Sequence, residues 1–156
     1  MEQLRVIQLE RCGLTPESLT ALMAGVTGGC HQLEKFVLAG DTCLGTVGVA
    51  ESVGVFLRGT SHLRELKLGW CGLTPHSLTT LMTHMTGGCL QLEEFNLNND
   101  HSPCLDTETA AQSLCDCLRQ WTRLRRLHLE QCRLTSQTFD VVSTGIRQCH
   151  ELQEFM

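Results

Sequence analysis

A short phrase of residues recurs along this 156-residue chain at a nearly fixed interval. Three copies begin with Leu-Arg and run over residues 4–30, 63–89 and 124–149, with Cys, Leu and Thr at matching places. A second phrase, which begins with Leu and carries Phe three residues later, starts at Leu33 and again at positions 92 and 152. The six starts are 28 to 32 residues apart. A period of this length predicts a solenoid, in which each unit buries its apolar face only against its neighbours.

Each unit predicts a short strand followed by a helix. Leucines two residues apart indicate the strand, because alternate side chains of a strand point to the same face. Thr15 then suits a helix N-cap, Pro16 the first helical position and Gly28 the end of the helix. Residues 74–88 repeat this arrangement. The helix expected over 45–57 contains Gly48 and Gly54 in its interior, and each of them weakens a helix by about 1 kcal/mol.

The leading pattern of every unit, L-x-x-[LIF]-x-L-x-x-[CD], is the leucine-rich-repeat signature. It predicts an α/β fold, a right-handed α/β horseshoe with a parallel β-sheet on the concave face and helices on the convex face. We expect one domain over residues 1–156, with repeats that start near 4, 33, 63, 92, 124 and 152. No polar capping repeat is visible at either end, so we expect a fragment of a longer chain that associates through its end repeats or unfolds easily.

Composition narrows the classes of function. The net charge of −5 is mild, and the triplet Arg123, Arg125 and Arg126 is too small to indicate nucleic-acid binding. No run of 18 apolar residues is present, which predicts that no segment spans a membrane. The start of the chain does not resemble a secretory signal, and we therefore expect a cytoplasmic, reducing location.

Ten cysteines raise the question of disulfides or a metal site. Six of them occupy two fixed repeat positions, namely the strand end (Cys12, Cys71, Cys132) and the residue before the next strand (Cys30, Cys89, Cys149). Small buried thiols explain both positions, and no metal is expected. Cys115 and Cys117 point about 200° apart on a helix, which disfavours a shared metal. A disulfide between Cys43 and Cys104, which lie in equivalent repeats, stays open.

Catalytic motifs for phosphate loops, zinc proteases, serine hydrolases and dinucleotides are absent from the sequence. The seven histidines are scattered and suit solvated surface positions better than a catalytic base or a metal ligand. We therefore expect neither an enzyme nor a cofactor. Binding of a protein partner is the function that this architecture favours.

The outward positions of the strands are the candidate binding surface, because their side chains are not needed for the core. Trp70 stands out, since exposed tryptophans beside small residues often dominate interfaces. It can instead fold over Lys67 or a neighbouring strand and cover the sheet. Trp121 takes a framework position and is predicted to be core. The candidate partner-binding residues are Trp70, Lys67, Glu65, Val37, Lys35, Asn96, Glu94, Arg126 and His128.

The phrases quoted above resemble leucine-rich repeats of the ribonuclease-inhibitor type, which alternate two repeat forms of about this length. That resemblance implies a horseshoe and protein recognition. The cysteine before every second strand (Cys30, Cys89 and Cys149) is similar to the one in the C-terminal repeats of NOD-like receptors, which implies a ligand sensor in an innate immune receptor.

Two other contexts stay open. The Gly-Cys…Leu-Glu…Leu…Cys-x-Leu-Thr cadence is similar to that of F-box proteins, which select substrates for ubiquitin ligases, although their repeats are shorter. An enzyme regulator is the third context, resembling ribonuclease inhibitor itself or the GTPase-activating protein of Ran.

Overall fold

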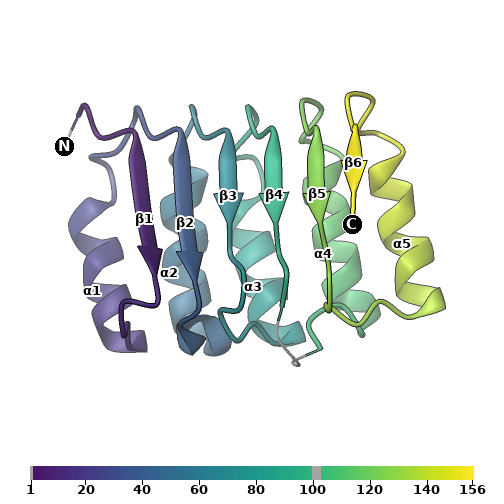
Figure 1. Cartoon of the computed structure of the whole chain (residues 1–156), viewed down its shortest axis with the longest axis horizontal. Coiled ribbons are helices and arrows are strands. Elements are labelled where there is room, and N and C mark those ends of the chain that lie inside the picture. Colours follow the sequence, from purple (N-terminus) through teal and green to yellow (C-terminus); the bar gives the residue numbers. More distant parts are fainter. Residues whose placement is uncertain (1, 100–102) are drawn as a thin grey trace.

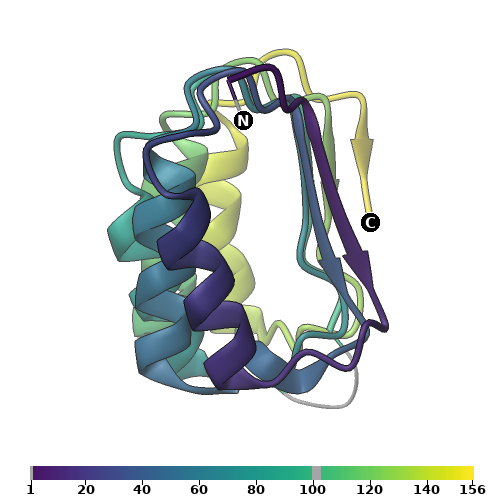
Figure 2. The ribbon, with the colours of Figure 1, turned by 90° about the vertical axis from the view of Figure 1, so that its left-hand side faces the viewer.

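The computed structural model describes residues 2–99 and 103–156, and it shows two layers, a sheet and a row of helices (Figures 1 and 2). Strands and helices alternate along the chain, and the strands lie side by side in sequence order, all parallel. The strands are β1 (Val6–Glu10), β2 (Lys35–Ala39), β3 (Glu65–Lys67), β4 (Glu94–Asn96), β5 (Arg126–His128) and β6 (Glu154–Phe155). The helices are α1 (Pro16–Val26), α2 (Val47–Arg58), α3 (Pro75–Met85), α4 (Glu108–Leu118) and α5 (Ser136–Ile146), with a short 3-10 turn at Thr42–Gly45.

Each crossover from one strand through a helix to the next strand is right-handed, and all five helices cover the same face of the sheet (Figure 1). Neighbouring strands are about 4.8 Å apart, whereas packed helices need about 8–10 Å. The helix row therefore fans out beyond the strand row, and the open face of the sheet becomes the inner, concave side. The predicted leucine-rich-repeat solenoid is confirmed.

Threonine side chains start four of the helices, as the sequence predicts for Thr15 and Thr74. The Thr15 hydroxyl accepts a hydrogen bond from the Ser18 N–H at 3.1 Å, and Ser18 Oγ accepts in return from the Thr15 N–H at 2.9 Å. The same reciprocal capping is present at α3 and α5, and Thr107 caps α4. A Thr-x-x-Ser or Thr-x-x-Thr spacing therefore fixes where the chain turns from strand to helix.

Helix α2 begins at Val47, two residues later than predicted, and runs to Arg58 despite its glycines. Helix packing explains one of them, Gly54. A Cβ atom at Gly54 would lie 2.8 Å from the Cβ of His84 and 2.9 Å from the Leu81 carbonyl oxygen. Gly145 makes the equivalent close approach from α5, where a Cβ would lie 2.9 Å from the Cys115 carbonyl oxygen. These glycines let adjacent helices touch, which offsets their low helix propensity.

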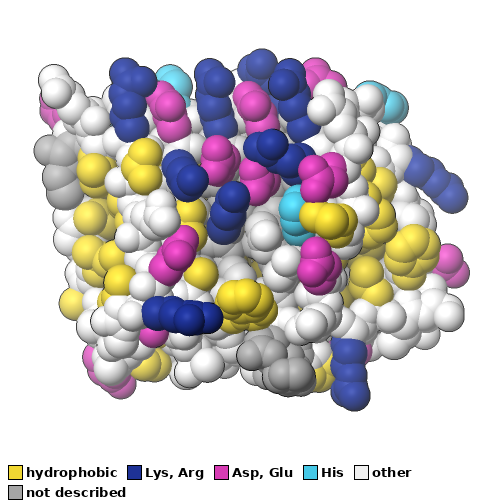
Figure 3. Space-filling view, in the orientation of Figure 1, with side chains coloured by type: hydrophobic (Ala, Val, Ile, Leu, Met, Phe, Trp, Pro, Cys, Tyr) yellow, Lys and Arg dark blue, Asp and Glu magenta, His cyan; other side chains and the backbone are white. Residues whose placement is uncertain are grey.

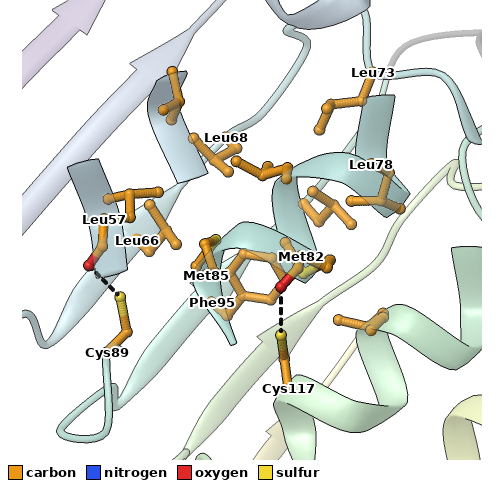
Figure 4. Close-up of a cluster of buried hydrophobic side chains, with 14 of the residues drawn as sticks. Leu57, Leu66, Leu68, Leu73, Leu78, Met82, Met85, Cys89, Phe95 and Cys117 are labelled. Carbon is orange, nitrogen blue, oxygen red and sulfur yellow. Dashed lines mark hydrogen bonds between the residues drawn. The ribbon is translucent and has the colours of Figure 1, made fainter. Parts of the chain in front are cut away.

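The core lies between the two layers as one continuous apolar cluster. The register of the sheet aligns one inward side chain from each strand, in the order Ile7, Phe36, Leu66, Phe95, Leu127 and Phe155. Side chains of α2 and α3 close over this row (Figure 4). Trp121 packs edge-on against Phe95 with ring centroids 5.0 Å apart, and it is only 1% exposed, so its predicted core role is confirmed.

The buried cysteines connect successive repeats. At the strand ends, Cys71 donates to the Leu38 carbonyl at 2.9 Å and Cys132 donates to the Leu97 carbonyl at 3.0 Å. Each acceptor belongs to the preceding repeat. Each thiol thus satisfies a backbone oxygen that no strand or helix uses.

A second set of thiols reaches the carbonyls at the ends of helices. Cys89 donates to the Leu57 carbonyl of α2 at 3.3 Å, and Cys117 donates to the Met82 carbonyl of α3 at 3.4 Å (Figure 4). Burial raises the pKa of Cys89 to about 11 and that of Cys117 to about 12, which keeps both thiols protonated and able to donate. The same two carbonyls also accept the backbone N–H and the hydroxyl of Thr60 and Thr86, so each thiol adds a donor from the next repeat to an oxygen at a helix end.

All ten cysteines lie within the described residues and are free thiols, including Cys43 and Cys104. Cys12 is exposed, which corrects the expectation that every strand-end cysteine is buried. Its repeat has no described neighbour on that side to supply a carbonyl, so its thiol turns to the Glu10 carbonyl of its own strand at 3.4 Å. A strand-end cysteine is therefore buried only where a neighbouring repeat covers it, and the sequence of its own repeat does not decide this.

Asp41, which takes the strand-end position in place of cysteine, also connects successive repeats. Asp41 accepts hydrogen bonds from the backbone N–H groups of Cys12 at 3.0 Å and Gly13 at 3.2 Å. It therefore holds the turn of the preceding repeat. Asp100, the second aspartate of this kind, lies outside the described residues.

Candidate recognition surface on the sheet

The sheet register collects eight of the predicted binding residues in two adjacent rows on the concave face. Because paired strands are parallel and in register, equivalent repeat positions become lateral neighbours. The first row is Lys35, Glu65, Glu94 and Arg126, and the second is Val37, Lys67, Asn96 and His128. Trp70 follows β3, three residues beyond Lys67.

Ion pairs join the first row to the second. Glu94 lies at the centre, with the Lys67 ammonium 2.7 Å from Oε1 and the Arg126 guanidinium 2.6 Å from Oε2. Lys35 Nζ lies 3.2 Å from Glu65 Oε2. Burial of Glu94 acts to raise its pKa, but the hydrogen bond from Lys67 and the charges of Lys67 and Arg126 outweigh it and lower the pKa below the ordinary value. Glu94 is therefore ionised at neutral pH, and its charge is compensated within the protein.

A third row of charges lies just before the strands and arises from the two alternating phrases. The Leu-Arg phrase supplies Arg5 and Arg64, and the Leu-Glu phrase supplies Glu34 and Glu93 between them. Arg5 pairs with Glu34 at 2.9 Å and Arg64 with Glu93 at 3.6 Å. Figure 3 shows acidic and basic side chains gathered over this first half of the strands, with fewer of them towards the strand ends. Most charges of the concave face are thus already paired.

Trp70 lies beyond these rows and has a different environment. Its side chain is 48% exposed, and its backbone N–H donates to the Asn98 carbonyl at 2.8 Å. Its φ of +55° is in the left-handed region, as are those of Arg11 and Gln131 at the same repeat position. This bend ends the strand and turns the indole onto the concave face.

A shallow depression of about 210 Å³ lies beside the indole. Small and apolar residues form part of its lining, and polar side chains complete it. The lining residues are Glu10, Val37, Ala39, Lys67, Gly69, Trp70, Asn96 and Asn98. Trp70 thus borders an open hollow instead of closing over the sheet, although it lies beside Lys67 as the alternative interpretation expects.

Two predicted residues are less accessible than their outward positions suggest. Val37 is only 3% exposed, and it lines the depression together with Lys67 and Trp70. The Glu94 side chain is 8% exposed because its two cationic partners cover it. Outward direction on a sheet therefore does not guarantee contact with solvent when long side chains from neighbouring strands lean over it.

His128 is another covered member of the second row. Its side chain is 14% exposed, and Nε2 lies 3.5 Å from Glu154 Oε1. Within the described residues this nitrogen is buried and makes no hydrogen bond. His128 thus contributes a polar edge close to Glu154 and little surface for a partner.

The predicted set omits four members of the depression, namely Glu10, Ala39, Gly69 and Asn98. A sequence signal for them exists, because all four occupy the outward position two residues after the second row. Ala39 and Gly69 leave room beside the indole, and a Cβ at Gly69 would meet the Asn98 carbonyl oxygen only at 3.5 Å. The small size of Ala39 and Gly69 gives the hollow its depth. Because they are neither charged nor aromatic, they do not stand out as binding residues in the sequence.

Residues 2–99 and 103–156 contain neither a metal-binding cluster nor a membrane-spanning helix. No group of three or more His, Cys, Asp and Glu side chains there is placed to hold a metal ion. No described helix is both long and apolar enough to cross a membrane.

Comparison with known proteins gives one informative similarity. No protein-family model matches the chain. The ribonuclease inhibitor of Sus scrofa, a leucine-rich-repeat protein, is 29% identical over 153 residues, which cover 97% of this chain and 32% of the relative. The chain thus spans about a third of the length of that curated protein. Its repeats, parallel sheet and helix layer together make it a leucine-rich-repeat solenoid similar to ribonuclease inhibitor.

Proposed function

We propose that this chain is a non-catalytic protein-recognition module that holds its partner on the concave face of the sheet. The observation that carries the proposal is the half-exposed Trp70 beside an open depression. Tryptophan is the residue type most enriched among the side chains that dominate binding energy. Its backbone is fixed by the bond to Asn98, so little conformational entropy is lost when a partner covers it.

The charged rows have a different role in this proposal. Lys35, Lys67 and Arg126 already pair with carboxylates of the same face. Exposed ion pairs add little to affinity, but they set the orientation of a partner and reject unsuitable ones. Trp70 therefore supplies most of the affinity, and the paired rows supply specificity.

The biological context that we favour is a cytoplasmic sensor segment of a NOD-like receptor, on the basis of the repeat phrases. Similarity to ribonuclease inhibitor supports the general role in protein binding. That similarity spans a third of the relative and favours neither the F-box context nor the enzyme-regulator context. Self-association through the end repeats remains a prediction, which sedimentation of the isolated chain at several concentrations tests.

The test of the proposal uses a phage-displayed library of random peptides, selected on the immobilised wild-type protein. We expect enriched peptides to bind the Trp70→Ala variant about 30-fold more weakly, which corresponds to about 2 kcal/mol. Phe139→Ala is the matched control, because Phe139 is an exposed aromatic residue of α5, in the helix layer. Peptides that bind wild type and Trp70→Ala equally well would contradict the proposal.

A further inference from the structure

The two asparagines of the depression are held in a fixed orientation. Asn96 Oδ1 accepts the backbone N–H of Asn98 at 3.0 Å, and Asn98 Oδ1 accepts the backbone N–H of Glu130 at 3.1 Å. An N–H group needs an oxygen opposite it, so neither carboxamide can flip without losing its bond. The NH₂ end of each side chain is therefore the end left for a ligand. No acceptor for either NH₂ group occurs among the described residues.

Two further donors border the same hollow. The Trp70 indole N–H has no acceptor within the described part of the chain. The Lys67 ammonium carries three N–H donors and lies 2.7 Å from Glu94 and 3.9 Å from Glu65. The side of the depression formed by β3, β4 and the residues after them thus offers hydrogen-bond donors. Three cations, Lys35, Lys67 and Arg126, pair there with two carboxylates, Glu65 and Glu94, so these ion pairs keep one positive charge in excess.

The one carboxylate that lines the depression lies on the opposite side. Glu10 belongs to β1, three strands away from β4, which corresponds to about 14 Å at about 4.8 Å per strand. Its Oε1 already accepts a hydrogen bond from Gln8 Nε2 at 3.0 Å. The donor side is therefore not neutralised by Glu10, and Val37, Ala39 and Gly69 separate the two sides with uncharged surface.

We propose that the donor side of this depression binds a carboxylate, the side chain of an Asp or Glu in the partner protein. The asparagine NH₂ groups donate to its oxygens, and these bonds are charge-assisted because the acceptor is ionised. The excess positive charge of the neighbouring ion pairs attracts the acid. An apolar residue next to that acid packs against the indole of Trp70. This inference rests on the proposed function and adds the chemistry of the partner.

A cationic group is the competing occupant, because an exposed indole can also hold Lys or Arg against its face. The surroundings of Trp70 oppose that choice. The excess positive charge of the ion pairs around Lys67 would repel a cation, and the NH₂ groups of Asn96 and Asn98 have no lone pair to offer it. The depression therefore favours an acceptor, and the test below distinguishes the two occupants.

The decisive variant is Asn96→Asp combined with Asn98→Asp. Each aspartate keeps the oxygen that accepts a backbone N–H, so the fold is retained, but each NH₂ donor becomes a carboxylate oxygen. Gln131→Glu combined with Gln153→Glu is the control, because it adds the same charge at exposed positions outside the depression. Thermal melting of both variants verifies that they remain folded.

The measurement is the affinity of peptides selected on the wild-type protein from a displayed random library. We expect a recurrent Asp or Glu next to an apolar residue, and at least about tenfold weaker binding to the Asn96→Asp, Asn98→Asp variant with little change for the control. The inference is overturned if the peptides depend on Trp70 but show no preference for Asp or Glu, or prefer Lys or Arg at that position. Either outcome leaves the proposed function intact. Equal weakening by the control overturns the inference as well. Peptides that ignore Trp70, or a selection that enriches none, contradict both proposals.

Discussion

The two tryptophans of the chain occupy opposite environments in the same solenoid. Trp121 is 1% exposed, packs edge-on against Phe95 and donates from its indole N–H to the Gly88 carbonyl at 3.4 Å. Trp70 is 48% exposed and borders a hollow on the concave face. Residue type is the same in both cases, so the position within the repeat decides whether a large side chain holds the fold or faces a partner.

The physical basis of this difference is the division of each repeat into framework and outward positions. Framework side chains fill the space between sheet and helices, and every repeat must supply one of suitable size. Outward side chains have no such constraint, so a tryptophan, an arginine or a glutamine fits equally well after the strand. Five substitutions, in four experiments, test how sharply this division holds.

Replacement of Trp121 by Ala has the largest expected effect. It removes the ring that packs on Phe95 and leaves the Gly88 carbonyl without its donor, so we expect the free energy of unfolding to fall by about 3–5 kcal/mol. Urea denaturation followed by circular dichroism measures it. A loss below about 1 kcal/mol would mean that this framework position is not essential to the core.

Cysteines at one repeat position provide a matched pair. Cys132→Ala removes the thiol that donates to the Leu97 carbonyl, and we expect a loss of about 1–2 kcal/mol because that buried oxygen loses its partner. Cys12→Ala changes an exposed thiol, so its effect should stay within about 0.5 kcal/mol. Denaturation curves of the two variants measure both losses of free energy of unfolding. Equal losses would show that contact with a neighbouring repeat does not determine how much this cysteine contributes to stability.

Glu94 points outward but is covered by Lys67 and Arg126. Because it is ionised and paired there, we expect the stability of the protein to depend modestly on pH. The folded-state pKa of Glu94 is lowered, so its contribution is complete above the unfolded pKa of about 4.3 and disappears as the pH falls through the folded value. We expect Glu94→Gln to cost about 1 kcal/mol at pH 7 and to reduce the loss of stability on acidification. Melting temperatures of both proteins from pH 7 to about pH 3 measure this, and parallel curves would exclude the ion pairs as its cause.

Trp70→Ala has the smallest expected effect on folding. Because the indole is half exposed and fills no core space, the free energy of unfolding should change by less than about 0.5 kcal/mol. Acrylamide quenching of tryptophan fluorescence adds an independent readout, since the variant should retain only the poorly quenched emission of Trp121. A large loss of stability, or quenchable emission that persists, would place Trp70 with the framework residues.

Local features of the fold were predictable from the sequence. The threonine caps at Thr15 and Thr74 follow from residues close together in the chain, and the structure confirms them. The outward rows were predictable as well, because the period places equivalent positions side by side. The packing role of Gly54 was not predictable, since it depends on the distance between two helices.

Some features of the candidate surface were likewise predictable from the sequence, and others were not. Sequence position identified Trp70 and the charged rows, but not that Lys67 and Arg126 would cover Glu94 or that Val37 would lie within the depression. The orientation of the Asn96 and Asn98 carboxamides also depends on backbone N–H groups placed by the fold. These features arise between repeats and leave no pattern within one repeat.

The amino-acid sequence by itself determined the period, the order of strand and helix in each repeat, the helix starts and the set of outward residues. Capping, backbone preference and alternation act over a few residues, so they can be recognised in the linear chain. Only the tertiary structure decided which outward side chains meet solvent, which thiols are buried and where a hollow opens beside Trp70. Those properties depend on what the neighbouring repeat places within a few ångströms, and about 30 residues of sequence separate the two sides of each such contact.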